Sequence, residues 1–277
     1  MKKNIIITEE QFDRILESKG LLNEHVAVID NTGDAQKMIG MQWKSPDDVW
    51  FIQVTQRKKD FRSYNKRHGG TSKWWKRVPG EDGTSRENFV GYGLVQGNSA
   101  QEAMDNLKNI TIHLNPWAAQ IIGKNDVTSN GGMEAIYTLC DTLWARAYIT
   151  INSRSLSRTK RIASRSNDPR ALEKELSRNH RDPKFSPWSM IDMDIDDPNA
   201  WSETDTALQK INLNPTIMHN SHDGKHYFFN NRGIMNYTEH SPEFRPIAKK
   251  YAASKQPGEA FTMKYDAKMI IYSPCGQ

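Results

Sequence analysis

Alternating apolar and polar positions divide this chain into short strands and amphipathic helices. Six segments rich in β-branched, aliphatic or aromatic residues have the composition of strands: 49–55, 89–95, 147–151, 188–195, 225–229 and 268–272. The first two flank a long polar stretch, so we expect them to form a hairpin around it.

Helical spacing of apolar residues predicts five further elements. Thr8 and Gln11 stand at capping-box spacing, as do Ser202 and Asp205, and Ser99 is an expected N-cap. Pro169 would occupy the first position of another helix. The expected helices cover residues 8–18, 100–109, 133–143, 169–178 and 202–211.

This order of elements predicts an α/β or α+β fold. We expect residues 1–38 to form an amphipathic helix and a polar linker, and residues 39–277 to form the main body. Within that body, residues 39–132 would be an α/β layer with a basic loop, and residues 133–277 a second core. Residues 123–132 are expected to be a loop.

Bulk properties narrow the class of protein. The chain has 277 residues, a formal charge of +5 and two cysteines, so neither a disulfide framework nor a cysteine zinc site is indicated. No apolar run is long enough for a membrane span, and Glu9 and Glu10 interrupt the short apolar start. We therefore expect no membrane partner and a cytoplasmic location, which is the host cytoplasm if a phage encodes the chain.

The most specific feature is an acidic strand, residues 188–197. With a period of two, Asp192, Asp194 and Asp196 share one face, opposite Ile191 and Met193. Carboxylates on one face repel each other, and Mg²⁺ or Mn²⁺ bound between them would remove that repulsion. The alternative is a solvated edge strand that ends in an acidic turn.

A glycine loop precedes the strand at 225–229. Ser221 and Gly224 lie in this loop, and Gly224 would let the backbone approach a phosphate. Lys225 and His226 would then contact triphosphate oxygens. The alternative is a hairpin turn with an incidental histidine. Asp266, before the last apolar strand, is a further candidate carboxylate or a turn residue.

In this order, the segments 190–194, 221–226 and 265–266 resemble the hhDhD, SxxGxH and hD motifs of the archaeo-eukaryotic primase superfamily. The resemblance covers residues 135–277 and implies a primase-like catalytic core, with an RRM-like sheet packed against an N-terminal α/β layer. It implies Asp192, Asp194 and Asp266 as metal ligands and His226 as the nucleotide contact, in a minimal module of phage or plasmid type. The metal pair could instead be Asp194 and Asp196.

Two basic segments are candidate nucleic-acid contacts. Residues 144–184 hold a local excess of arginine, whose planar side chain suits phosphate, and the candidates there are Arg154, Arg158, Arg161 and Arg165. In the polar stretch after residue 56, Trp74 and Trp75 could stack on unpaired bases. The alternatives are an ordinary solvated face for the arginines and core packing for the tryptophans.

These features predict a metal-dependent nucleotidyltransferase of primase-polymerase type. Its partners would be nucleoside triphosphates and a single-stranded DNA or RNA template, with a helicase as a further candidate. A nuclease using the same carboxylates is one alternative, and a non-catalytic nucleic-acid-binding or virion-associated protein is another. The sequence contains no Walker loop, HExxH or CxxC motif, which disfavours P-loop NTPases and zinc enzymes.

Overall fold

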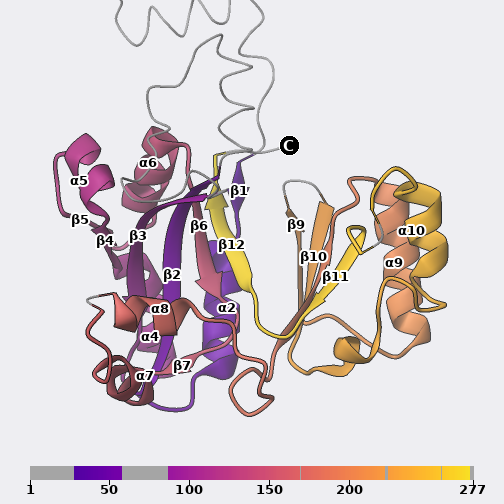
Figure 1. Cartoon of the computed structure of the whole chain (residues 1–277), viewed down its shortest axis with the longest axis horizontal. Helices are drawn as coiled ribbons and strands as arrows, with labels where there is room; N and C mark the ends of the chain where they lie inside the picture. The colour runs from indigo at the N-terminus through magenta and orange to yellow at the C-terminus, as the bar shows by residue number, and fades with distance from the viewer. Residues whose placement is uncertain (1–27, 58–86, 169, 222–223, 257, 275–277) are drawn as a thin grey trace, which may run out of the picture.

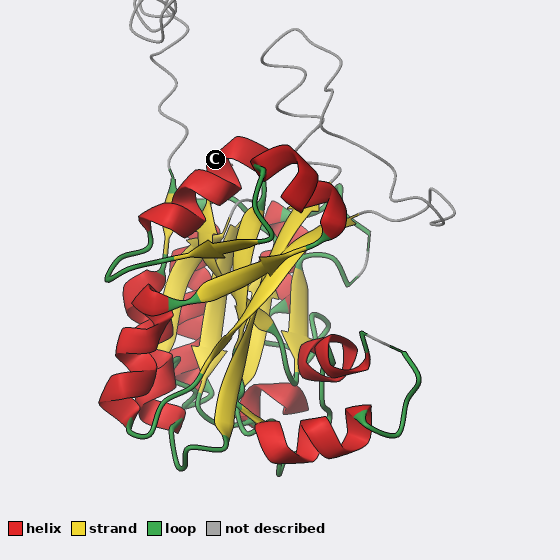
Figure 2. Ribbon diagram, turned by 90° about the vertical axis from the view of Figure 1, so that its left-hand side faces the viewer, coloured by secondary structure: helices red, strands yellow, loops and turns green. Residues whose placement is uncertain are grey.

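Two antiparallel sheets and the helices around them form the molecule (Figure 1), an α+β arrangement. The computed structural model describes residues 28–57 and 87–274, except residues 169, 222–223 and 257. Figure 2 shows the strands in the middle of the molecule with helices around them. The helices are α2 (Thr32–Gln42), α4 (Ala100–Asn106), α5 (Pro116–Ile122), α6 (Glu134–Leu143), α7 (Leu156–Ala163), α8 (Ala171–Ser177), α9 (Pro198–Lys210) and α10 (Arg245–Tyr251), with 3₁₀ turns at η1 (Leu107–Asn109) and η2 (Gly233–Asn236).

The large sheet has eight strands in the order β1-β12-β6-β2-β3-β4-β5, with β7 paired to β2. β2 is its centre: it is the longest strand among the described residues and pairs with β3, β6 and β7. The strands are β1 (Ile29–Asp30), β2 (Asp48–Arg57), β3 (Glu87–Val95), β4 (Thr111–Leu114), β5 (Asp126–Thr128), β6 (Arg146–Thr150), β7 (Arg154–Ser155) and β12 (Lys268–Ser273).

Side-chain alternation gives the large sheet two different faces. On one face, Ile52 and Val54 of β2 pack with Ile149 of β6 under α2, α4, α5 and α6. On the other face, Val49 and Phe51 are covered by α7 and α8. Beyond Phe51, this second face turns toward the small sheet.

The small sheet has four strands in the order β11-β8-β10-β9. They are β8 (Ser189–Met193), β9 (Ile217–Ser221), β10 (Gly224–Phe229) and β11 (Phe261–Lys264). Ile191, Met193, Tyr227 and Phe229 pack on its outer face against α9 and α10. Met190 and Phe228, on the inner face, join the core of the large sheet instead, so the two sheets share one apolar contact region.

Two segments of the chain connect the large sheet with the small one, and buried polar groups hold these two segments together. The Asp266 carboxylate, in the turn from β11 to β12, accepts from Arg154 Nη2 at 2.7 Å and from the His180 backbone N–H at 2.8 Å. Asn152 Nδ2 also donates to it at 3.0 Å, and the Asn152 side chain bonds both backbone groups of Trp188. These contacts connect the large sheet to both segments that lead into the small one.

Most elements expected from periodicity are present. The hairpin of β2 and β3, the helix capped by Ser99, and α6, β6, β8, β10 and β12 are confirmed. The expected helix at 8–18 and the basic loop at 58–86 lie outside the described residues.

Several boundaries were wrong. The polar stretch expected as a linker through residue 38 forms β1 and begins α2, whose Ala35, Met38 and Ile39 are fully buried. The loop expected at 123–132 contains β5, and α9 starts at Pro198, where the Asp197 side chain accepts from the Asn199 N–H. The short elements α7, β9 and β11 were not predicted.

The boundary between the two sheets does not fall at residue 133, where the second core was expected to begin. β6, β7, α6, α7 and α8 lie with the large sheet, and the small sheet begins only at β8. Among the described residues, no helix is long and apolar enough to cross a membrane.

We predict that Asp266→Ala lowers the free energy of unfolding by about 3–5 kcal/mol, because it leaves Arg154 buried without a counter-charge. Both side chains are almost fully buried. Urea unfolding followed by circular dichroism measures the change. The double variant Arg154→Met/Asp266→Leu should lose less than Asp266→Ala alone, since it removes both charges. A loss of less than about 1 kcal/mol for Asp266→Ala, the value of an exposed pair, would contradict this assignment.

Candidate functional site

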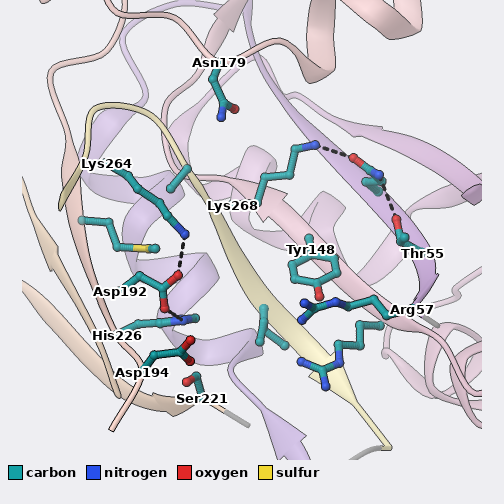
Figure 3. A pocket seen from close by; sticks show the side chains of 15 residues that line it. Thr55, Arg57, Tyr148, Asn179, Asp192, Asp194, Ser221, His226, Lys264 and Lys268 are labelled. Carbon is teal, nitrogen blue, oxygen red and sulfur yellow. Dashed lines mark hydrogen bonds and ion pairs between the residues drawn. The ribbon is translucent and has the colours of Figure 1, made fainter. Parts of the chain in front are cut away.

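A cavity of about 370 Å³ lies between the facing sides of the two sheets (Figure 3). Residues from three neighbouring strands of the large sheet form one wall: Gln53, Thr55, Arg57, Arg146, Tyr148, Lys268 and Ile270. The other wall comes from the small sheet: Met190, Asp192, Asp194, Ser221, His226 and Lys264. Asn179 and Ala267, from the two segments between the sheets, complete the lining.

Strand alternation determines which side chains reach this cavity. Ile191 and Met193 of β8 are buried against α9 and α10, which turns Asp192 and Asp194 toward the large sheet. This is the division of faces that the sequence predicted. In the antiparallel register, Asp192 lies directly opposite His226, so the two side chains project from the same face.

Asp192 is the most strongly held carboxylate of the site. Its Oδ1 lies 3.0 Å from His226 Nε2, and its Oδ2 contacts Lys264 Nζ from the neighbouring strand β11. Burial alone would raise the pKa of Asp192, but the hydrogen bonds and charges of His226 and Lys264 outweigh burial and lower that pKa. The carboxylate is therefore ionised at neutral pH.

A second histidine, His219, lies behind His226. It stands opposite His226 in β9, with the two ring centroids 5.4 Å apart. Burial, with a smaller contribution from the charge of His226, lowers the pKa of His219 to about 3, so its ring is neutral at neutral pH. Its Nδ1 lies 3.9 Å from the Asp34 carboxylate of α2, which places it at the contact between the layers.

The opposite wall is cationic. Arg57, Arg146 and Lys268 come from β2, β6 and β12, three adjacent strands, and all three line the cavity. Arg146 is almost fully buried, and Lys268 Nζ donates to Gln53 Oε1. The sequence interpretation missed these three residues and Lys264. The detectable signal was a single charged residue at the start of a mostly apolar strand, Arg146 in β6 and Lys268 in β12.

The structure brings only some of the predicted site residues together. Asp192, Asp194, His226 and Ser221 share the cavity. Asp266 does not line it, since its carboxylate is enclosed in the contact between the sheets. Asp196 is exposed beyond the end of β8 and does not line the cavity.

Two residues predicted to contact the nucleotide have other surroundings. Lys225 projects from the opposite face of β10 to His226, and its Nζ lies 3.4 Å from the Asp205 carboxylate of α9. Gly224 passes so close to β8 that an added Cβ would collide with the Met193 carbonyl oxygen. The close packing of β10 on β8 therefore explains why a glycine stands at this position, and no phosphate contact is needed to account for it.

The residues predicted to contact nucleic acid also lie in different surroundings. Arg154 is buried in its ion pair with Asp266, so it presents no charge to the surface. Arg158 stacks on the Phe185 ring at 3.8 Å, while Arg161 and Arg165 are exposed at the end of α7. Trp74 and Trp75 lie outside the described residues.

Asp192 and Asp194 are the cavity's candidate ligands for a magnesium-type ion. No cluster of three or more histidine, cysteine, aspartate or glutamate side chains suited to a metal occurs within residues 28–57 and the described part of 87–274. Mg²⁺, however, is commonly held by one or two carboxylates together with substrate phosphates. Asp192 and Asp194 provide two such groups on one wall, and Asp192 already binds the cationic Lys264.

Comparisons of this chain with protein-family models, with curated proteins and with solved structures found no match. Its function therefore has to be argued from the cavity itself.

The lowered pKa of Asp192 predicts an acid-sensitive contribution to stability. Because the unfolded chain takes up this proton at a higher pH than the folded protein, the contribution is complete above about pH 5 and is lost progressively as the pH falls through the ordinary carboxyl pKa and below it. We expect the urea midpoint of Asp192→Asn to fall less than that of the wild type between about pH 7 and about pH 3.

Asp196→Asn is the matched control, because Asp196 is exposed on the same segment. Its midpoint should follow the wild-type dependence on pH. Equal slopes for wild type and Asp192→Asn would contradict the assigned ion pairs.

Proposed function

We propose that this protein is a metal-dependent nucleotidyltransferase of the primase-polymerase type. One observation carries the proposal: the cavity places two carboxylates and a histidine on one wall and three cationic side chains on the facing wall. A metal–polyphosphate substrate needs both kinds of partner, carboxylates for the ion and cations for the phosphate oxygens.

Each wall has a distinct role in this proposal. Asp192 and Asp194 would hold the divalent cation, which when bound supplies positive charge next to the transferring phosphoryl group. Arg57, Arg146 and Lys268 would bind the phosphate oxygens from the opposite side. The guanidinium groups offer paired donors in one plane, which suits phosphate, and the burial of Arg146 strengthens its contacts.

His226 would hold the catalytic carboxylate in place and contact the nucleotide. Its Nε2 faces Asp192 Oδ1 at 3.0 Å, so this edge of the ring fixes the carboxylate. Because both side chains also line the cavity, a substrate that enters there meets the pair together. Ser221, beside Asp194 in Figure 3, adds a hydroxyl to the same wall.

The template would lie on the side of the large sheet that α7 and α8 cover. This is the sheet face that continues into the cavity, because Phe51 under these helices and Gln53 at the cavity are two residues apart on β2. Arg161 on α7 and Arg165 just after it are exposed and would suit the phosphates of a single strand of DNA or RNA.

The primase superfamily is the nearest chemical precedent for this arrangement, with one difference. Asp192, Asp194 and His226 share the cavity, as the resemblance implies, while Asp266 has a different position. The proposal therefore assigns Asp266 to the junction between the sheets and rests the chemistry on Asp192 and Asp194.

A nuclease is the second candidate, because the close Asp192–His226 pair could also orient a water molecule for attack on a phosphodiester. Both functions need the same carboxylates, so their products distinguish them. A polymerase lengthens a strand only with nucleoside triphosphates, and a nuclease shortens it without them.

We predict that Asp192→Ala/Asp194→Ala abolishes template-dependent nucleotide incorporation with Mn²⁺, lowering it by at least about 10³-fold, because the ion loses both carboxylates. Extension of a labelled primer and de novo synthesis on single-stranded DNA measure the effect. Asp196→Ala is the matched control and should keep its activity. Strand shortening by the wild type without nucleotides, lost in the double variant, would establish the nuclease instead. Activity retained in the double variant would overturn both assignments.

A further inference from the structure

We infer that Lys264 is a built-in counter-ion that a divalent cation must displace from Asp192, so that this lysine sets the metal affinity of the site. The inference rests on the proposed function, because it concerns the carboxylate assigned there to the metal.

The contact itself is the first part of the argument. Lys264 Nζ meets Asp192 Oδ2 directly, and His226 takes Oδ1, so both oxygens of this carboxylate already have cationic or hydrogen-bonding partners. Figure 3 shows Lys264 reaching down to Asp192 from one side and His226 lying on the other. A metal ion and an ammonium group cannot occupy the same position on one oxygen.

The second part is the mobility that the position of Lys264 permits. Lys264 is the last residue of β11, and its side chain is 38% exposed, whereas the Asp192 side chain is 25% exposed. A lysine has a long flexible stem and a strongly hydrated ammonium group. It can therefore leave Asp192 for solvent or for a substrate phosphate, while the carboxylate stays in place on β8.

The third part is the contrast with the neighbouring carboxylate. Lys255 Nζ lies 3.9 Å from Asp194 Oδ2 and also bonds the Asp194 backbone carbonyl. That contact is longer and only partly directed at the carboxylate.

Lys264 then has two states, one paired with Asp192 and one released from it. Without metal it neutralises Asp192 through their direct contact. With metal bound, the ion takes over Asp192 and the ammonium group is released toward the phosphates in the cavity. Lys264 is a positioning residue in the first state and a substrate-binding residue in the second.

The test is a titration of the full-length chain with Mn²⁺ in the absence of nucleotide. Binding is measured as the loss of the free Mn²⁺ signal in electron paramagnetic resonance. Lys264→Met removes the ammonium group and keeps the aliphatic stem, so we expect its dissociation constant for Mn²⁺ to fall roughly tenfold relative to wild type. Lys264→Gln should shift it in the same direction and serves as the second variant should Lys264→Met not fold.

Lys250→Met is the matched control, because Lys250 pairs with Glu203 at 2.6 Å on the outer helices. Its Mn²⁺ affinity should equal that of wild type. In the background of Asp192→Asn, Lys264→Met should no longer raise the affinity, since the carboxylate for which the two cations compete is gone.

The outcomes separate this inference from the proposed function. If wild type binds Mn²⁺, Asp192→Asn loses that binding, and Lys264→Met binds equally or more weakly, the metal site stands and the counter-ion role is overturned. If neither wild type nor either Lys264 variant binds Mn²⁺, the metal assignment itself is overturned. Tighter binding by Lys264→Met, dependent on Asp192, establishes the exchange.

Discussion

The buried ion pair between Arg154 and Asp266 is the contact on which the rest of this architecture depends. A charge pair without solvent stabilises a structure only when its remaining hydrogen-bonding capacity is satisfied, and here Asn152 and the backbone of His180 supply the additional donors to Asp266. Because these residues belong to the large sheet and to both connecting segments, the pair determines how the small sheet is placed. The cavity exists only in that placement.

The same junction explains how opposite charges face each other across the cavity. The charged residues of each wall extend from strands whose other faces are packed with apolar residues, such as Ile149 under α2 and Ile191 under α9. The apolar faces of both sheets are therefore packed, and their charged faces line the cavity. The short apolar contact of Met190 and Phe228 with the large sheet closes one side of the space.

The acidic strand could be predicted from the sequence because its signal is local. Alternation between Ile191, Met193 and the aspartates requires only the two-residue period of a strand, and the composition of residues 225–229 identified β10 with His226. The prediction of a linker through residue 38 was wrong for a related reason. The helix α2 has a weak apolar stripe, and only its burial against the large sheet makes it a core element.

The sequence by itself determined the strand that carries Asp192 and Asp194, the face that these residues share, and the mixed class of the fold. Tertiary structure alone decided that Asp266 and Arg154 pair inside the molecule, and that Arg57, Arg146 and Lys268 face the carboxylates. The physical reason is that alternation is a property of neighbouring residues, whereas the partners across a cavity depend on which strands become adjacent. β2 and β12 are about 200 residues apart in the chain, and only the order of the folded sheet brings their cations to the same wall.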